Sequence, residues 1–264
     1  MSQVVLITGA SSGIGKATAE YLHQQGYIVY GTSRRQISAT PYHMLQMDIT
    51  DDQAIAEGIK TILEQAGKID VLINNAGLGT AGALEETPLN DIRKVFDTNV
   101  MGVVKLIQEV LPHMRQQKAG KIINISSLGG MMGLPYRATY CSSKFAIEGL
   151  TEALRMETAG FGVQVCSLLP GDVNTSINDH RLTVENPDSV YQDSFERTHQ
   201  IMNDDVAQGI SAEAVAKKVH RLIKRKKIGG KYLVGKPLQK LTVFLKRRLP
   251  NAIFEQIIKI YYKV

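Results

Sequence analysis

The sequence of 264 residues predicts a single α/β domain, in which a doubly wound parallel sheet of about seven strands carries helices on both faces. Short apolar runs alternate along the chain with segments of helical periodicity, as repeated strand–helix units require. The runs are apolar on both faces, which is typical of parallel strands covered on both sides. No linker, internal repeat or low-complexity segment divides the chain, so we expect one domain over residues 1–264.

The first half of the chain alternates regularly between expected strands and helices. The apolar run VVLITG is a strand, and the glycine-rich run after it opens a helix that Gly26 ends. A second helix has Asp51 or Asp52 near its N-cap and closes at Gly67. We expect strands at 4–9, 28–33, 43–48 and 69–77, and helices at 13–26, 51–67, 88–98 and 99–117.

The second half continues the alternation around one irregular segment. Residues 174–211 are polar and acidic, with a helical pattern near 189–203 and no clear strand, and we expect them to form a mobile substrate lid. Residues 236–264 form a basic amphipathic C-terminal extension. The remaining expected elements are strands at 121–127, 163–171 and 231–234 and helices at 138–160 and 211–226.

Composition indicates an ordinary globular protein. Hydrophobic residues make up 44% and charged residues 21%, and no run approaches the roughly 18 consecutive apolar residues of a membrane-spanning helix. The N-terminus has no basic leader, so we expect no secretory signal. Cys141 and Cys166 are too few for a disulfide framework and favour a reducing, cytoplasmic setting. The six histidines show no metal-ligand spacing, so we expect no metal site.

The net charge of +6 is concentrated at the C-terminal end. Residues 217–264 contain 15 Lys and Arg, a single acid and many interleaved apolar residues. In the last segment Ile253, Ile257 and Tyr261 share one helical face. Three interpretations remain open: packing on the same domain or a sister subunit, peripheral contact with a membrane surface and, least favoured, binding of nucleic acid or an acidic partner.

A glycine-rich loop, TGASSGIG at 8–15, joins the first strand to the first helix. Gly9 permits the tight turn, Gly13 lets the backbone approach a pyrophosphate, and Gly15 packs the helix against the strand. The anion would then lie on free N–H groups at the positive end of the helix. Between a clear strand and a clear helix, this loop predicts dinucleotide binding by a Rossmann-type domain.

The residues that end the second strand indicate which dinucleotide is bound. An acid at this place would bind the ribose 2′-hydroxyl and repel a 2′-phosphate. Ser33 stands there instead, followed by Arg34 and Arg35, and a guanidinium beside a small hydroxyl is a good receptor for a phosphate dianion. We therefore expect a preference for NADP(H); the alternative is a pair of solvated surface arginines.

Six motifs occur in one order between residue 3 and about residue 175. They are TGASSGIG, NNAG at 74–77, Asn99, the serine pair at 126–127, YCSSK at 140–144 and PGDVNT at 170–175. Together they resemble the short-chain dehydrogenase/reductase family, and VYGTSRR, ALEET and the long region after PG are most similar to its 17β-hydroxysteroid-dehydrogenase-like branch. The resemblance implies an oxidoreductase that interconverts a carbonyl and an alcohol with a nicotinamide cofactor.

The YCSSK motif carries the predicted acid–base chemistry. Four residues apart on a helix, Tyr140 and Lys144 share one face. A free tyrosine has a pKa near ~10, and a nearby ammonium favours the phenolate, so Tyr140 can give a proton to a carbonyl or take one from an alcohol. By the resemblance, Lys144 also holds the nicotinamide ribose, Ser127 binds the substrate oxygen and Asn99 holds a water that relays protons through Lys144. Cys141 and the two serines beside it are expected to pack the helix.

Further cofactor contacts follow from the resemblance and from position beyond the carboxyl ends of the strands. Asp48 is expected at the adenine, the backbone of residues 75–77 along the adenine ribose, and Val173 and Thr175 at the nicotinamide amide. The complete expected cofactor set is Gly9, Ser11, Ser12, Gly13, Ile14, Gly15, Ser33, Arg34, Arg35, Asp48, Ile49, Asn75, Ala76, Gly77, Tyr140, Lys144, Pro170, Gly171, Val173 and Thr175.

The substrate is expected to be uncharged and hydrophobic. The loops after the fourth, fifth and sixth strands supply mostly apolar walls and no cluster of Arg or Lys, which favours a ketone or secondary alcohol of steroid, retinoid or aliphatic type. The resemblance also implies a homo-oligomer, a dimer or a tetramer, formed through the helices at 99–117 and 138–160. Two other functions remain open: a non-catalytic NADP(H)-binding regulator, and a membrane-associated protein that acts through its tail. The expected wall residues are Leu78, Met131, Met132, Leu134 and Tyr136.

Overall fold

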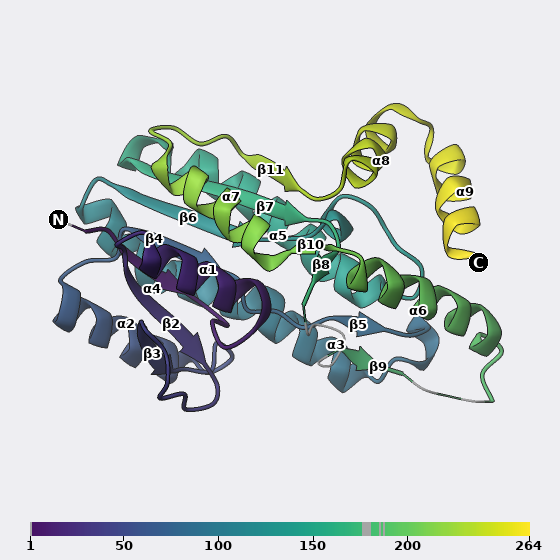
Figure 1. The fold of residues 1–264 in the computed structure, drawn as a ribbon, viewed down its shortest axis with the longest axis horizontal. Coiled ribbons are helices and arrows are strands. Elements are labelled where there is room, and N and C mark those ends of the chain that lie inside the picture. The colour runs from purple at the N-terminus through teal and green to yellow at the C-terminus, as the bar shows by residue number, and fades with distance from the viewer. Residues whose placement is uncertain (1, 176–180, 185, 187) are drawn as a thin grey trace.

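Seven parallel strands form one sheet in the computed structural model, which describes residues 2–175, 181–184, 186 and 188–264 (Figure 1). The strand order is β11–β7–β6–β4–β1–β2–β3, so the chain builds outward from β1 on one side and then on the other. The strands are β1 (Val4–Ile7), β2 (Ile28–Ser33), β3 (His43–Gln46), β4 (Val71–Asn74), β6 (Gly120–Ile125), β7 (Val163–Pro170) and β11 (Lys231–Val234). The predicted doubly wound sheet is confirmed.

Helices cover both faces of this sheet (Figure 1). Along β1, Val4 and Leu6 pack into the core beneath α2, α4 and α5, whereas Val5 and Ile7 pack on the opposite face, beneath α1 and α7. Because successive side chains of a strand point to opposite faces, this alternation requires β1 to be apolar throughout. These helices are α1 (Gly13–Gln24), α2 (Asp52–Ala66), α4 (Gly102–Gln116), α5 (Ala138–Glu157) and α7 (Ala212–Lys224).

The two helices expected over 88–117 are joined without a break. α3 (Leu89–Phe96) passes through a π-helical turn, Asp97–Met101, directly into α4. Such single wide turns inside helices often mark functional positions, and this one contains Asn99. Short 3₁₀ turns complete the helical elements at Leu84–Glu86, Leu128–Gly130 and Ala159–Phe161.

The prediction that 174–211 contains no strand is wrong. Its β9 (Leu182–Thr183) pairs with β5 (Thr80–Ala81), and its β10 (Ile210–Ser211) pairs with β8 (Val173–Asn174). Strands of two residues are too short to show periodicity, so they are defined by their partners. The predicted helix is present as α6 (Gln192–Ala207), and residues 176–180, 185 and 187 of the expected lid lie outside the described residues.

The C-terminal extension packs on the end of the domain where β7 and β11 finish (Figure 1). Phe254, Ile258 and Tyr262 are buried in a third apolar cluster with residues of α6, so one face of the extension packs on its own domain. The face that contains Ile253 and Ile257 stays exposed. Within the described residues, no helix is both long and apolar enough to cross a bilayer. The extension consists of α8 (Pro237–Arg248) and α9 (Asn251–Tyr262).

Candidate active site

A cavity of about 750 Å³ opens where the carboxyl ends of the sheet strands meet. This edge, beside the point where the strand order reverses between β1 and β4, is where open α/β sheets bind ligands. Ser127 and all of the expected cofactor residues except Gly15 line the cavity. The structure therefore brings together residues from six separate loops.

The glycine loop has the backbone shape that a pyrophosphate cradle needs. Gly9 and Gly13 have φ angles of +67° and +53°, in the left-handed region that favours glycine. A Cβ on Gly15 would collide with the carbonyl oxygen of Gly9 and with the side-chain amide of Asn75. Gly15 thus lets α1 lie against the loop without lining the cavity, and the residues present fit a dinucleotide pyrophosphate at the N-terminus of α1.

Thr8 and Asn75 hold this loop in place. The Thr8 hydroxyl accepts hydrogen bonds from the backbone N–H groups of Asn75 and Ala76, both at 3.0 Å. The Asn75 side-chain amide donates to the carbonyl oxygens of Thr8 at 2.8 Å and Gly9 at 3.2 Å. The Asn75 side chain is therefore engaged with the loop. This role of Thr8, which follows β1 directly, was not predicted from the sequence.

The turn after β2 presents two arginines at the far end of the cavity. Ser33 is buried, and its hydroxyl accepts a hydrogen bond from the Arg35 backbone N–H at 3.1 Å. Arg34 and Arg35 are exposed and line the cavity. Asp48, which also lines it, accepts hydrogen bonds from Thr50 through one carboxylate oxygen at 2.9 and 2.8 Å. The two guanidinium groups thus belong to an ordered turn.

Tyr140 and Lys144 lie in the first two turns of α5 and line the opposite end of the cavity. The Lys144 side chain is only 6% exposed, and its Nζ donates to the Ile125 carbonyl oxygen at 3.0 Å. Nζ lies 5.8 Å from the Tyr140 ring centroid. Ser127 hydrogen-bonds to the Tyr140 phenol, so the three side chains expected to act together are neighbours.

Burial acts on both titratable groups of this pair. It raises the pKa of Tyr140 and lowers the pKa of Lys144 to about 8. The hydrogen bond from Ser127 and the charges of Arg137 and Arg181 oppose the rise in the Tyr140 pKa. This opposing effect was expected from Lys144, and the two arginines were not predicted from the sequence. A phenol that remains protonated at neutral pH suits a proton donor.

Asn99 is buried beside the cavity and does not line it. Its side-chain oxygen accepts from the Leu78 N–H at 2.7 Å, and its amide donates to the Leu78 carbonyl at 2.9 Å and to the Ser143 hydroxyl at 3.0 Å. Ser143 in turn donates to the Tyr140 carbonyl oxygen at 2.7 Å. Asn99 therefore joins the π-helical turn, the loop after β4 and α5, and Ser143 has a polar role beyond the packing that was expected.

The turn after β7 is held by the C-terminal extension. The Gly171 N–H donates to the Val234 carbonyl oxygen at 2.8 Å. Gln239 of α8 donates to the Asp172 carboxylate at 2.5 Å and accepts from the Lys236 N–H at 3.0 Å. Since Gly171 and Asp172 both line the cavity, α8 supports the site directly.

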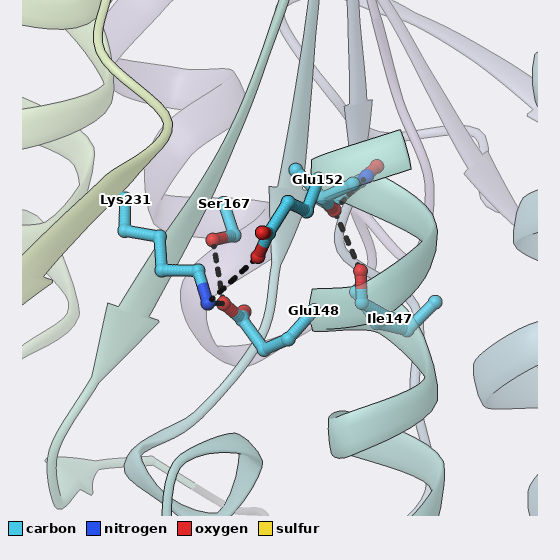
Figure 2. A network of polar contacts seen from close by, with 7 residues as sticks. Ile147, Glu148, Glu152, Ser167 and Lys231 are labelled. Carbon is cyan, nitrogen blue, oxygen red and sulfur yellow. Dashed lines mark hydrogen bonds and ion pairs between the residues drawn. The ribbon is translucent and has the colours of Figure 1, made fainter. Parts of the chain in front are cut away.

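An acidic residue behind Lys144 connects α5 to the edge of the sheet. Figure 2 shows the Glu148 carboxylate between Ser167 of β7 and Lys231 of β11, at 3.1 and 3.2 Å. Glu152 approaches the same ammonium at 3.8 Å. Glu148 is buried, and its charge raises the pKa of Lys144 against the larger effect of burial. The network therefore fixes the helix that presents Lys144.

The expected substrate walls require correction. Of the five, only Leu78 lines the cavity; Met132 is buried in the third apolar cluster, and the others pack around it or in a separate groove. The side chains that line the reactive end instead include Arg137 and Arg181. The expectation of walls without a cationic cluster is therefore wrong. Arg137 precedes Tyr140 by one helical turn and was open to detection, whereas Arg181 lies in a segment without a pattern.

The remaining reactive side chains have structural surroundings. Cys141 and Cys166 are buried free thiols, and burial raises the pKa of each. A thiol whose pKa is raised is a poor nucleophile at neutral pH, which agrees with the packing role expected for Cys141. The described part of the chain contains no group of three or more His, Cys, Asp or Glu placed to hold a metal ion.

The sequence profile of the family described as short chain dehydrogenase matches residues 3–186. The chain belongs to this family. Estradiol 17-beta-dehydrogenase 1 of Rattus norvegicus is 38% identical to this short-chain dehydrogenase over 195 residues, 67% of this chain and 56% of that one. Relatives matched over the full length include the 3-ketodihydrosphingosine reductase of Bacteroides thetaiotaomicron, with 41% identity over 99% of this chain and 98% of that one. The NADPH-dependent 3-dehydrocapnine reductase of Ornithobacterium rhinotracheale has 32% identity over 98% and 95%.

Solved structures agree with the fold of this short-chain dehydrogenase. A family member from Burkholderia phymatum in complex with NAD superposes with a TM-score of 0.81 and 29% identity, covering 92% of each chain. ElxO with NADP bound superposes with a TM-score of 0.74 and 30% identity, covering 88% of this chain and 96% of that one. The named relatives are oxidoreductases, and the family binds a nicotinamide cofactor. The solved structures do not choose between NAD and NADP.

Proposed function

We propose that the chain is an NADP(H)-dependent oxidoreductase for the carbonyl or alcohol carbon of a hydrophobic ketone or secondary alcohol. The observation that carries the proposal is the grouping of Ser127, Tyr140 and Lys144 at one end of a cavity whose other end is the glycine loop. A single ligand that spans the cavity would place its reactive end beside the Tyr140 phenol. Bound NADPH would supply the hydride.

The residues of the chain then supply orientation and the proton. Ser127 and Tyr140 both hydrogen-bond to the substrate oxygen, and Tyr140 donates the proton that the new alkoxide needs. Lys144, fixed by the Ile125 carbonyl, would hold the nicotinamide ribose and replenish the Tyr140 proton. Asn99 positions Leu78 and Ser143, and through them the floor of the site. In the oxidative direction Tyr140 accepts the proton.

The preference for NADP(H) rests on Arg34 and Arg35, which line the cavity beside the buried Ser33. A bidentate guanidinium suits the 2′-phosphate, and no carboxylate stands at the end of β2 to repel it. The name of the NADPH-dependent relative from Ornithobacterium rhinotracheale supports the same choice. The Asp48 carboxylate then faces the adenine end of the cofactor.

Among steroid, retinoid and aliphatic substrates we favour the aliphatic class. The relative named as a 3-ketodihydrosphingosine reductase matches nearly the whole chain, tail included, whereas the steroid dehydrogenase matches two thirds of it. A long-chain ketone is therefore the substrate class to test first.

The decisive experiment follows NADPH absorbance with a panel of long-chain and steroid ketones. Tyr140→Phe should abolish turnover, because the proton donor is lost, while NADPH binding measured by fluorescence stays close to that of the wild type. Phe145→Leu, at an exposed position one turn further along α5, is the matched control and should remain active. Turnover by Tyr140→Phe would refute the assignment. Tight NADPH binding without turnover of any ketone by the wild type would favour a non-catalytic regulator.

We also propose a cytoplasmic location with peripheral contact to an anionic membrane surface through α8 and α9. Side chains such as Ile260, 69% exposed, lie among basic residues, and a basic amphipathic surface binds anionic lipid through both kinds of contact. The exposed apolar residues of this surface are Leu238, Leu241, Phe244, Ile253, Ile257 and Ile260. We further propose that the outer faces of α4 and α5 form a homodimer or homotetramer.

Co-sedimentation with vesicles tests the membrane proposal. The wild type should sediment with phosphatidylglycerol vesicles and less with phosphatidylcholine vesicles. Leu241→Gln combined with Phe244→Gln should lose this binding. Met156→Gln, a substitution of a more exposed apolar residue on α5, should keep it. Equal sedimentation of the wild type and the double variant would contradict the proposal.

A further inference from the structure

The reactive end of the cavity contains an arginine that uses only part of its hydrogen-bonding capacity. Arg137 lines the cavity one turn before Tyr140. Its Nε and Nη2 atoms are buried and have no hydrogen-bond partner. A buried donor without a partner is costly, and a guanidinium more so, because its charge cannot be removed by deprotonation. Such a group inside a ligand cavity indicates a partner that arrives with the ligand.

The two unpartnered atoms are the pair that recognises oxyanions. Nε–H and the adjacent Nη2–H lie along one edge of the planar guanidinium and point in nearly the same direction. This edge matches two oxygens of a carboxylate, sulfonate or phosphate in a bidentate arrangement. Tyr262 occupies another part of the group: its ring centroid lies 5.0 Å from the Arg137 Cζ, and the two side chains share a hydrogen bond. Packing therefore leaves the oxyanion-binding edge unsatisfied.

A second guanidinium reinforces the positive charge at this end. Arg181 also lines the cavity, and its Nη1 donates to the Asn203 side-chain oxygen at 3.2 Å. Burial, and after it the charge of Arg137, lowers the pKa of Arg181. The charges of both arginines act on the Tyr140 phenol, so the three side chains are electrostatically coupled. An anion between the arginines would relieve their repulsion and would lie near the reacting oxygen.

An acidic side chain beside this cluster already has another partner. Asp172 lines the same end of the cavity, and its carboxylate accepts the hydrogen bond from Gln239. Burial and the nearby Asp205 raise the pKa of Asp172. Asp205 is itself engaged with the Tyr261 hydroxyl at 2.8 Å. The Asp172 carboxylate is therefore held by Gln239, and Nε and Nη2 of Arg137 remain without a hydrogen-bond partner.

We propose that the substrate carries an oxyanion close to its reacting carbonyl, and that Arg137 and Arg181 bind this oxyanion while the hydrocarbon chain occupies the rest of the substrate end. The proposal rests on the proposed function and makes it narrower: the substrate is an acidic amphiphile and not a neutral ketone. Carboxylate, sulfonate and phosphate share the required geometry. Arg137 is then a specificity-determining residue.

The experiment compares substrates that differ only in this group. A medium-chain γ-keto acid, its methyl ester, and the sulfonate and phosphate of equal chain length are each assayed with NADPH. At least one anionic ketone should exceed the ester in kcat/KM by about 10- to 100-fold, the usual value of hydrogen bonds to a charged group. The order among the three anions identifies the headgroup. An ester that is reduced as efficiently as every anion overturns the inference and leaves the proposed function intact, whereas reduction of none contradicts the proposed function itself.

Variants separate recognition from stability. Arg137→Gln should raise the KM of the anion by a far larger factor than it changes kcat/KM for the ester. Arg137→Lys should restore part of the advantage of the anion, because the charge returns without the paired edge. Arg181→Gln should act in the same direction. Arg221→Gln, at an exposed position on α7, is the matched control and should change nothing.

A purely structural role for Arg137 makes a different prediction. Loss of its packing on Tyr262 would lower the melting temperature and reduce turnover of ester and anion by the same factor. Inhibition by an alkyl sulfonate, measured against the ester, provides a readout that needs no anionic substrate. Its inhibition constant should rise about 10-fold or more in Arg137→Gln. An unchanged constant would overturn the proposal.

Discussion

Burial governs the chemistry of the Tyr140–Lys144 pair at the scale of single residues. It raises the pKa of the Tyr140 phenol and lowers the pKa of the Lys144 ammonium, so two pKa values that are ordinarily close move apart. The ammonium is then the stronger acid of the two, and passing a proton from Lys144 to a Tyr140 phenolate is favourable. Asn99 and Ser143 hold the backbone around the pair.

Lys144 should show this burial in the pH dependence of stability. Its pKa is about 8 in the folded protein and 10.5 in an ordinary lysine. Below pH 8 the lysine is charged in both the folded and the unfolded protein, and burying this charge opposes folding. Between pH 8 and pH 10.5 the unfolded chain binds more protons than the folded protein, so the free energy of unfolding rises with pH. Lys144→Met should abolish turnover. The variant should gain free energy of unfolding over the wild type at pH 7, and this gain should be smaller at pH 10. Chemical denaturation at both pH values measures this, and an unchanged difference would show that the lysine is not buried as a charge.

Gly15 provides a test of the close packing between α1 and the glycine loop. Gly15→Ala places a methyl group against the Gly9 carbonyl and the Asn75 amide, so the loop must move. NADPH affinity should fall by about 10-fold or more, the equivalent of about 1.4 kcal/mol. Gly133→Ala, where a Cβ meets nothing within 4 Å, is the control and should bind NADPH normally. If Gly15→Ala binds NADPH with the wild-type affinity, the glycine loop can shift to accommodate the methyl group, and the prediction is wrong.

The residues of the site divide according to the signal that each leaves in the sequence. The glycine loop, Tyr140 and Lys144 occur in motifs with fixed spacing, and the structure gathers them as expected. Arg181 is brought to the site by a segment without periodicity, so only the fold reveals its position. The unused edge of Arg137 depends on side-chain packing, which no spacing records.

At the scale of elements, α5 connects the reactive residues to the edge strand β11. Lys231 compensates the buried Glu148, so Lys231→Met should leave a carboxylate without its partner (Figure 2). Since Lys231 is partly exposed, we expect the free energy of unfolding to fall by about 1–2 kcal/mol, less than for a fully buried ion pair. A loss of this size lowers the melting temperature by roughly 2–8 °C. Calorimetry measures the shift. Glu148→Gln combined with Lys231→Met should recover part of it, and equal melting of single and double variants would contradict the coupling.

Helices and strands long enough to show a repeating pattern of apolar residues were predictable from the sequence. Shorter elements were not. The strands of the main sheet are long apolar runs, and the amphipathic helices have clear ends, such as Asp51, which caps α2 through its side chain. The two-residue strands β5, β8, β9 and β10 exist only through pairing. The π-helical turn escaped because its residues have ordinary helical propensity and its geometry is set by packing around Asn99.

At the scale of the whole molecule, the tail is part of the catalytic domain. Removal of the chain from Lys236 onward would expose the α6 face that Phe254 and Tyr262 cover, and would remove the Gln239 contact to Asp172. The truncated protein should melt at a lower temperature and reduce ketones poorly even without any membrane. Thermal denaturation and a vesicle-free assay test this. Unchanged melting and turnover would mean that the tail is independent of the domain.

The Gln239–Asp172 hydrogen bond also restricts how such enzymes can diversify. Because a C-terminal helix reaches the turn at the reactive end, the tail cannot be exchanged as a separate module between relatives. A chimera that carries the tail of a relative should be active only when the residues on both sides of this contact, in the tail and in the turn after β7, come from the same parent. Substrate range and surface targeting would then change jointly, since one helix contributes to both.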